Sequence, residues 1–264
     1  MTSGDDFEGR SVLVTGAAGG LGSAYCLALA ARGAHVWVAD LDEDGAARMA
    51  QEVSAAGGSA RAVALDVADA ESWARIAQEV EQAGPLHGLV NNAGVSLRLG
   101  IGETSVEQWN QVMAVNLSSV FYGMKFLAPA LTSANGASVV NVSSIAGMVG
   151  YFSATYGTSK WGVRGLSKVG ALEFADRKVR VNSVHPGLTG TPLLHQAPDS
   201  SFVDASLRAV PEGRLASPDE IAAVVCFLLS DASSYINGAE LVADGGLTSG
   251  GLYHRILADL EDER

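Results

Sequence analysis

The stretch Val12-Leu13-Val14-Thr15-Gly16-Ala17-Ala18-Gly19-Gly20-Leu21-Gly22 decides how this chain folds. It joins a short apolar run to a glycine-rich turn, and the turn opens a segment of helical composition. Bare backbone at a helix N-terminus offers unpaired N–H groups, and the helix dipole there favours a phosphate. The stretch therefore predicts a dinucleotide-binding unit. Its spacing differs from the usual G-x-G-x-x-G fingerprint, so on its own the turn is also compatible with a flexible surface loop.

The same strand–helix alternation continues along the chain. Strands are predicted at Ser11–Thr15, His35–Ala39, Arg61–Leu65, Gly88–Asn91, Ser138–Val142, Arg180–Val184 and Glu240–Val242. Helices are predicted at Leu21–Arg32, Gly45–Ala56, Ala70–Ala83, Ser105–Ala130, Thr155–Phe174 and Pro218–Ser230. This order indicates an α/β fold: one doubly wound Rossmann domain over residues 1–264, with a mostly parallel seven-stranded sheet and helices on both faces. The longest segment without a clear element, residues 186–217, is expected to be a substrate loop.

Composition excludes several classes of function. The net charge is −12, from 17 basic and 29 acidic residues, which argues against binding to nucleic acid phosphates. Cys26 and Cys226 are far apart in predicted helices, so no disulfide is expected and a reducing, cytoplasmic location is the default. The chain shows no signal peptide, no membrane-spanning run and no cluster with metal-ligand spacing, so neither a membrane nor a metal is expected.

Tyr156 and Lys160 carry the strongest chemical signal. Their i, i+4 spacing places a phenol and an ammonium on one face of a predicted helix. A nearby ammonium favours the phenolate, so we expect it to lower the tyrosine pKa. A tyrosine that exchanges protons beside a nicotinamide that exchanges hydride is the chemistry of alcohol oxidation and ketone reduction.

Two further positions follow predicted strands. Asp40 ends the second strand, where a carboxylate can accept hydrogen bonds from the adenosine ribose and repel a 2′-phosphate; it favours NAD over NADP. A helix N-cap role in Asp40-Leu41-Asp42 is the alternative. Ser143 and Ser144 follow the fifth strand, where ligands sit in parallel sheets, and either serine can hold a substrate oxygen or simply make a turn.

Taken together, these motifs resemble the short-chain dehydrogenase/reductase family over nearly the whole chain. Thr15 to Gly22 is similar to its TGxxxGxG turn, Asn91-Asn92-Ala93-Gly94 to its NNAG motif, and Tyr156 to Lys160 to its YxxxK motif. The resemblance implies that the catalytic residues are Asn116, Ser144, Tyr156 and Lys160, with Asn116 holding a water that links Lys160 to solvent. It implies that the cofactor is held by Gly16, Gly20, Leu21, Gly22, Asp40, Leu41, Asp66, Val67, Asn92, Ala93, Gly94, Tyr156, Lys160, Pro186, Gly187, Thr189 and Thr191.

Within the family, the segments 156–168, 185–192 and 238–241 resemble bacterial hydroxysteroid dehydrogenases. We therefore expect an NAD(H)-dependent enzyme that interconverts a small hydrophobic secondary alcohol, such as a steroid or a cyclic or aryl alcohol, and its ketone. Pocket candidates are Ser96, Leu97, Val149, Tyr151, Phe152, Leu193, Leu194 and Phe202. The alternatives are a 3-oxoacyl-carrier-protein reductase and a non-catalytic dinucleotide-sensing protein.

An assembly of four copies is also expected. The predicted helices Ser105–Ala130 and Thr155–Phe174 are apolar on more than one face, and surplus apolar area marks an interface. The family resemblance implies that these helices pack between the subunits of a homotetramer.

Overall fold

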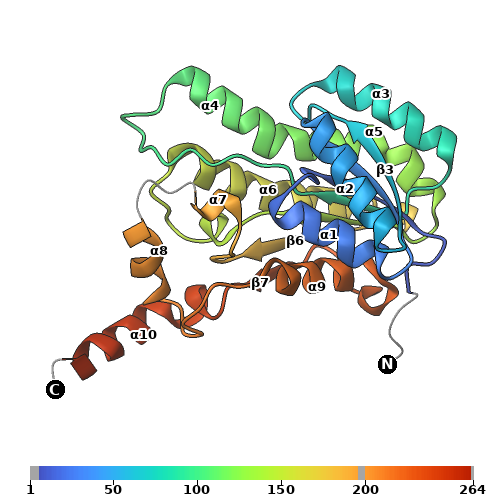
Figure 1. Cartoon of the computed structure of the whole chain (residues 1–264). Coiled ribbons are helices and arrows are strands. Elements are labelled where there is room, and N and C mark those ends of the chain that lie inside the picture. Colours follow the sequence, from blue (N-terminus) through green and yellow to red (C-terminus); the bar gives the residue numbers. More distant parts are fainter. Residues whose placement is uncertain (1–5, 196–199, 263–264) are drawn as a thin grey trace.

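The computed structural model describes residues 6–195 and 200–262. Its centre is one sheet of seven parallel strands in the order β3-β2-β1-β4-β5-β6-β7 (Figure 1). The strands are β1 (Ser11–Thr15), β2 (His35–Asp40), β3 (Ser59–Ala64), β4 (Gly88–Asn91), β5 (Ser138–Val142), β6 (Arg180–Pro186) and β7 (Glu240–Ala243). All adjacent pairs are parallel, so the doubly wound sheet predicted from the sequence is confirmed.

Helices cover both faces of the sheet. One face packs against α1 (Gly20–Ala30), α2 (Glu43–Ala55) and α9 (Pro218–Leu229). The other packs against α3 (Ala70–Ala83), α5 (Ser119–Ser133) and α6 (Ala154–Glu173). The central strands are apolar on both sides, as in Val12-Leu13-Val14, whose side chains alternate between the two cores.

The predicted helix Ser105–Ala130 is wrong as a single element. The structure has α4 (Val106–Met113), a π-helical turn η1 (Ala114–Ser118) and then α5. A π-helical turn accommodates an extra residue and displaces local backbone hydrogen bonds. Here it contains the fully buried Asn116. Hydrophobic periodicity cannot reveal such a turn, because the apolar pattern runs through it.

The sequence also missed three helices. The segment predicted as a loop over residues 186–217 contains α7 (Pro192–His195) and α8 (Ser200–Leu207). The last helix, α10 (Leu247–Asp262), reaches away from the body of the molecule (Figure 1). Its start is set by Asp244, whose carboxylate accepts hydrogen bonds from the backbone N–H groups of Gly246 and Thr248 at 2.9 and 2.7 Å. No helix in the described ranges has both the length and the apolar character needed to cross a membrane.

The glycine turn fits its place for steric reasons. Gly16 and Gly20 have φ of +62° and +57°, which side chains rarely adopt. Gly22 lies against the carbonyl oxygen of Gly16, and a Cβ built on Gly22 would come within 2.0 Å of that oxygen. By contrast, a Cβ on Gly19 would meet nothing within 4 Å. The turn is therefore packed on its inner side and open on the side that faces a ligand.

This contrast yields a stability prediction. We expect Gly22→Ala to lower the free energy of unfolding by about 1–3 kcal/mol or more, because overpacking must push α1 away from the turn. Gly19→Ala is the matched control, since its φ of −171° is ordinary extended backbone and its Cβ is uncontacted. Thermal and urea melts check this; equal midpoints for the two variants would contradict the packing role of Gly22.

Candidate active site

A cavity of about 680 Å³ lies at the carboxyl ends of the strands. This is where ligands bind in open α/β sheets. Of the predicted site residues, the cavity is lined by Gly16, Gly20, Leu21, Asp40, Leu41, Asp66, Val67, Asn92, Ala93, Gly94, Ser144, Tyr156, Lys160, Pro186, Gly187, Thr189 and Thr191. Gly22 and Asn116 do not line it. Gly22 packs behind the turn, and Asn116 is buried in η1.

The glycine-rich end of the cavity fits a dinucleotide. Helix α1 begins without a side-chain cap, so the backbone N–H groups of its first turn lack side-chain partners there. Both carboxylate oxygens of Asp40 already accept one backbone N–H, from Ala18 at 2.9 Å and from Asp42 at 3.0 Å. These bonds hold the carboxylate at the cavity, while each oxygen keeps a lone pair for a ribose hydroxyl.

The NNAG motif holds the turn in place. The side-chain amide of Asn92 donates to the backbone carbonyl oxygens of Thr15 and Gly16, at 2.9 and 3.1 Å. The hydroxyl of Thr15 accepts the backbone N–H groups of Asn92 and Ala93. The loop after β4 is thus tied to the glycine turn after β1, and the two together form a preformed cradle.

The structure separates the roles of the two serines. Ser143 is buried, and its hydroxyl donates to the backbone carbonyl of Lys160 at 2.8 Å. The hydroxyl of Ser144 accepts a hydrogen bond from the N–H of Ala146. Ser144 lines the same cavity as Tyr156, and its interaction with the phenol opposes the rise that burial causes in the pKa of Tyr156. Ser143 therefore fixes α6 to β5, and Ser144 is the serine placed beside the tyrosine.

Tyr156 and Lys160 come together on α6, although not in the way their spacing suggested. The Lys160 ammonium is buried, donates to the Val142 carbonyl at 2.9 Å and lies 5.7 Å from the centre of the Tyr156 ring. Burial lowers the pKa of Lys160 to about 8. Burial also raises the pKa of Tyr156, and the hydrogen bond with Ser144 opposes this rise. The expected lowering of the tyrosine pKa by Lys160 is therefore not seen in the protein alone.

Asn116 does not line the cavity but connects two segments beside it. Its side-chain oxygen accepts the N–H of Val95 at 2.8 Å, and its amide donates to the Val95 carbonyl and to the hydroxyl of Ser159. Ser159 directly precedes Lys160. Asn116 therefore joins the loop after β4 to the helix that carries the reactive pair.

The substrate end of the cavity is partly as predicted. Ser96, Tyr151, Leu193, Leu194 and Phe202 line it, whereas Leu97, Val149 and Phe152 do not. The sequence interpretation missed Arg98 and Gln111, which also line the cavity. No motif marks either residue, because their positions depend on how the loop after β4 and helix α4 fold over the cavity.

A buried histidine was also missed. His185 lies in β6, where one ring nitrogen contacts the Ser183 hydroxyl at 2.9 Å and the other contacts the Ser144 carbonyl at 3.3 Å. Burial lowers the pKa of His185, so the neutral ring is favoured. Through the contact with the Ser144 carbonyl, the His185 ring holds the backbone of Ser144 in place.

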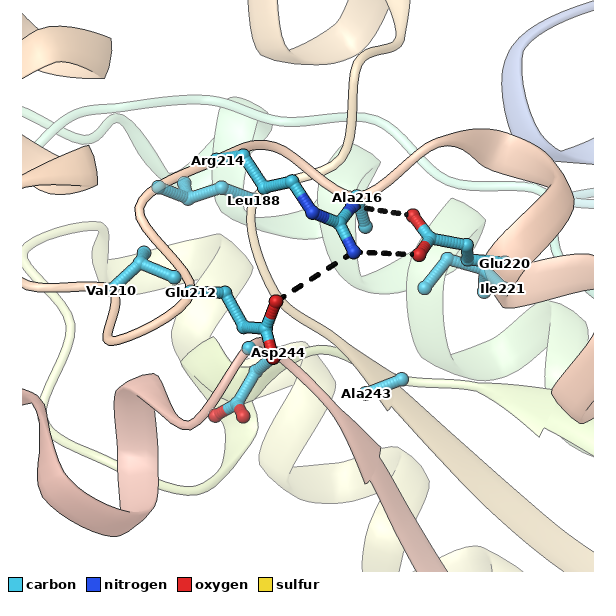
Figure 2. Close-up of a pocket in the computed structure, with 10 residues that line it drawn as sticks. Leu188, Val210, Glu212, Arg214, Ala216, Glu220, Ile221, Ala243 and Asp244 are labelled. Atoms are coloured by element: carbon cyan, nitrogen blue, oxygen red, sulfur yellow. Dashed lines mark hydrogen bonds and ion pairs between the residues drawn. The ribbon is translucent and has the colours of Figure 1, made fainter.

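A second, smaller pocket of about 220 Å³ lies beside the end of the loop 186–217 (Figure 2). Arg214 donates to both carboxylate oxygens of Glu220 at 2.8 Å and also pairs with Glu212. The ion pair and the backbone N–H of Ser217 hold the pKa of Glu220 at about 2. Leu188 is the one residue that lines both cavities, and none of the four predicted catalytic residues lines the smaller one. The cluster therefore anchors the loop to the start of α9.

Within 6–195 and 200–262, no three His, Cys, Asp or Glu side chains are grouped so that they could hold a metal ion.

Comparison with known proteins agrees with the fold. A family model described as enoyl-(acyl carrier protein) reductase matches residues 16–248. The chain belongs to the short-chain dehydrogenase/reductase family. The family resemblance of the sequence motifs is thereby confirmed.

Relatives of this protein include secondary alcohol dehydrogenases. It is 40% identical to cyclohexanol dehydrogenase of Acinetobacter sp. (strain SE19), over 92% of this chain and 96% of the relative. It is 42% identical to trans-4-hydroxycyclohexanecarboxylate dehydrogenase of Sinomonas cyclohexanicum, over 91% and 93%. It is 40% identical to 3-alpha-(or 20-beta)-hydroxysteroid dehydrogenase of Mycobacterium bovis (strain ATCC BAA-935 / AF2122/97), over 96% and 94%.

A solved structure gives the same fold. A candidate NAD(P)-dependent gluconate 5-dehydrogenase of Beutenbergia cavernae superimposes with a TM-score of 0.87 at 35% identity, over 93% of this chain and all of that one. That protein holds NADP at low occupancy. The family thus binds NAD or NADP, and the choice between them rests on the residues at the adenosine end.

The burial of Lys160 yields a second prediction. We expect Lys160→Met to abolish activity and yet to stabilise the cofactor-free protein by about 1–2 kcal/mol. The folded-state pKa of about 8 lies below the usual 10.5, so below pH 8 burial of the charge costs roughly 3 kcal/mol. Loss of the hydrogen bond to Val142 offsets part of the gain.

The pH dependence provides the check. Between about pH 8 and 10.5 the unfolded chain holds the Lys160 proton and the folded protein does not, so wild-type stability from this group rises with pH. The gain in the free energy of unfolding that Lys160→Met brings should therefore be largest below pH 8 and should decrease toward pH 10.5. Urea melts at pH 7 and 10 measure it, and a destabilised variant at pH 7 would contradict the argument.

Proposed function

We propose that this protein is an NAD(H)-dependent alcohol dehydrogenase that interconverts a secondary alcohol and its ketone. The observation that carries the proposal is the convergence of Ser144, Tyr156 and Lys160 on one cavity that also contains the glycine cradle and Asp40. The cyclic-alcohol and hydroxysteroid activities named for its relatives point to cyclic substrates of similar size.

In the proposed reaction each of the residues that line the cavity has a separate role. Ser144 holds the substrate oxygen, and Tyr156 takes or gives the proton on that oxygen. Lys160 holds the nicotinamide ribose and adds positive charge near the tyrosine. When bound, the nicotinamide accepts or donates the hydride. Leu193, Leu194 and Phe202, from the segment that contains α7 and α8, cover the substrate and exclude water.

The two alternatives fit the site less well. A non-catalytic sensor has no need for a serine, a tyrosine and a buried lysine around one cavity. A 3-oxoacyl-carrier-protein reductase must dock an acidic carrier, which a chain with a net charge of −12 disfavours.

Turnover tests the proposal. We expect NADH formation with cyclohexanol or a hydroxysteroid, and we expect Tyr156→Phe to reduce kcat by about 10²–10⁴-fold, the usual value of a positioned acid–base group. NADH affinity should stay nearly unchanged, because the ring still packs. Oxidation by the wild type should accelerate into the alkaline range, since the phenolate is the base and burial raises the pKa of Tyr156. Retention of most activity by Tyr156→Phe would refute this mechanism.

Cofactor choice is a separate prediction. We expect NAD to bind better than NADP, because Asp40 would face the 2′-phosphate. Asp40→Ser should reduce the ratio of NAD affinity to NADP affinity by about tenfold, which corresponds to about 1.4 kcal/mol. Asp42→Ser is the matched control: it removes a charge from the same cavity and leaves a serine, which still caps α2. Titration of both dinucleotides into each variant decides the point; tighter NADP binding by the unmutated protein would contradict it.

We also propose a homotetramer built on α5 and α6. Part of the apolar surface that suggested it is internal, since Val112, Val120, Val163 and Phe174 are buried within the chain. Phe121, Trp161, Val169 and Leu172 remain exposed, with Leu172 at 82%. These four side chains form an apolar surface on the two long helices that a neighbouring copy would cover.

Light scattering checks the assembly. We expect Val169→Asp combined with Leu172→Glu to reduce the measured mass, because two desolvated charges cannot be accommodated in a packed interface. Ile101→Glu is the matched control, since Ile101 is 89% exposed and lies outside both helices. A monomeric wild type at micromolar concentration, or equal masses for all variants, would count against the tetramer.

A further inference from the structure

The substrate end of the cavity contains an arginine that an apolar alcohol does not need. Arg98 lies in the loop after β4 and lines the cavity with Tyr151, Tyr156 and Phe202. Its Cζ lies 5.4 Å from the centre of the Phe202 ring. Burial raises the pKa of both Tyr151 and Tyr156, and the positive charge of Arg98 opposes this rise in each; for Tyr151 a hydrogen bond with Arg98 opposes it as well.

Most of the hydrogen-bonding capacity of this guanidinium is unused. Arginine has five N–H donors. In the described ranges, Nη2 of Arg98 faces the carbonyl oxygens of Leu193 and Leu194 at the long distances of 3.5 and 3.4 Å, and the guanidinium also interacts with the Tyr151 phenol. Its Nε is buried and has no hydrogen-bond partner. An unpaired buried donor has lost its hydration without compensation, so a ligand that supplies an acceptor to this guanidinium would remove that cost.

No described carboxylate neutralises Arg98. It forms no ion pair with any side chain in residues 6–195 or 200–262. The carboxylates that line the cavity are Asp40, Asp42 and Asp66, which follow β2 and β3 at the adenosine end. In a chain of net charge −12, a cation without a carboxylate partner among residues 6–195 and 200–262 is a local exception.

We propose that Arg98 is a specificity residue that recognises a carboxylate on the substrate, so that the preferred substrate is a secondary alcohol or ketone whose ring or chain carries an anionic carboxylate away from the reacting carbon. The inference rests on the proposed dehydrogenase function and makes its substrate class narrower. The planar guanidinium matches a carboxylate with two parallel N–H···O bonds. The apolar side chains of Leu193, Leu194 and Phe202 contact the carbon skeleton between the two polar ends.

A competing role for Arg98 is structural. Its contacts with Leu193, Leu194 and Phe202 would also hold the segment of α7 and α8 against the cavity. The two roles differ in one measurable respect. If Arg98 only holds that segment in place, its replacement changes kcat/KM by the same factor for every substrate. If Arg98 recognises a carboxylate, its replacement changes the ratio of kcat/KM between a charged substrate and a neutral one of the same shape. This ratio also cancels any effect of Arg98 on the pKa of Tyr156, because both substrates use the same tyrosine.

The test compares trans-4-hydroxycyclohexanecarboxylate with its uncharged carboxamide. We expect the wild type to have the higher kcat/KM for the carboxylate. Arg98→Gln should reduce the carboxylate-to-carboxamide ratio by about 10–100-fold, the usual range for a charge-assisted hydrogen bond. Arg98→Lys should restore part of the ratio, because it keeps the charge and loses the fork. Arg208→Gln, an exposed arginine outside the cavity that changes the net charge equally, should leave the ratio unchanged.

A binding measurement tests the recognition role of Arg98 independently of the proposed dehydrogenase activity. Calorimetry with the non-reacting pair cyclohexanecarboxylate and cyclohexanecarboxamide measures recognition without turnover. If no alcohol is oxidised but Arg98→Gln specifically weakens carboxylate binding, then the proposed function fails and the recognition role stands. If both substrates lose activity equally in Arg98→Gln and the binding ratio is unaltered, or if the wild type prefers the carboxamide, then the recognition role is wrong. Thermal melts of each variant identify any loss of folding.

Discussion

The active site depends on the burial of one positive charge. The Lys160 ammonium lies under the carboxyl end of β5, with the Val142 carbonyl as its acceptor, and burial lowers its pKa to about 8. A buried charge is costly unless it is hydrogen-bonded, so the acceptor of Lys160 must be held in place. Much of the local structure supplies that support. Ser143 fixes the Lys160 carbonyl to β5, and Asn116 fixes Ser159 to the loop after β4.

The same constraint explains the crowding around α6. Gly147 lies against the backbone of Lys160, where a Cβ would come within 2.6 Å of its carbonyl atoms. Arg164, one turn further along α6, donates to the Gly147 carbonyl and pairs with Glu240 of β7 at 2.9 Å. The short turn after β5, which contains Ser144, is therefore held on one side by α6 and on the other by His185 of β6. Catalytic geometry is a property of three adjacent strands and one helix rather than of the loop alone.

Much of this could be predicted from the sequence, because the relevant signals are local. The strands are apolar runs, and three of the seven begin and end where predicted. The glycine turn and Asp40 were found because a turn after a strand has a characteristic composition. The π-helical turn at Asn116 could not be found, since it depends on a contact with Val95, 21 residues earlier in the chain. The distinction between Ser143 and Ser144 likewise required the position of α6, and Arg98 acquires a role only once α7 and α8 fold beside it.

The cavity has opposite charges at its two ends, and this polarity restricts what it can bind. At one end Asp40 presents a carboxylate whose oxygens are held by backbone N–H groups, which suits hydroxyls and disfavours a phosphate. At the other end lies the guanidinium of Arg98, whose Nε has no hydrogen-bond partner among the described residues, and a positive charge there suits an anion. Tyr156 and Lys160, for which we propose the proton-transfer and ribose-binding roles, line the same cavity. Because the charges are separated along the cavity, a dinucleotide and an anionic substrate avoid mutual repulsion only when the adenosine lies at the Asp40 end. The polarity of the cavity thus favours the same orientation of the cofactor as the glycine turn does.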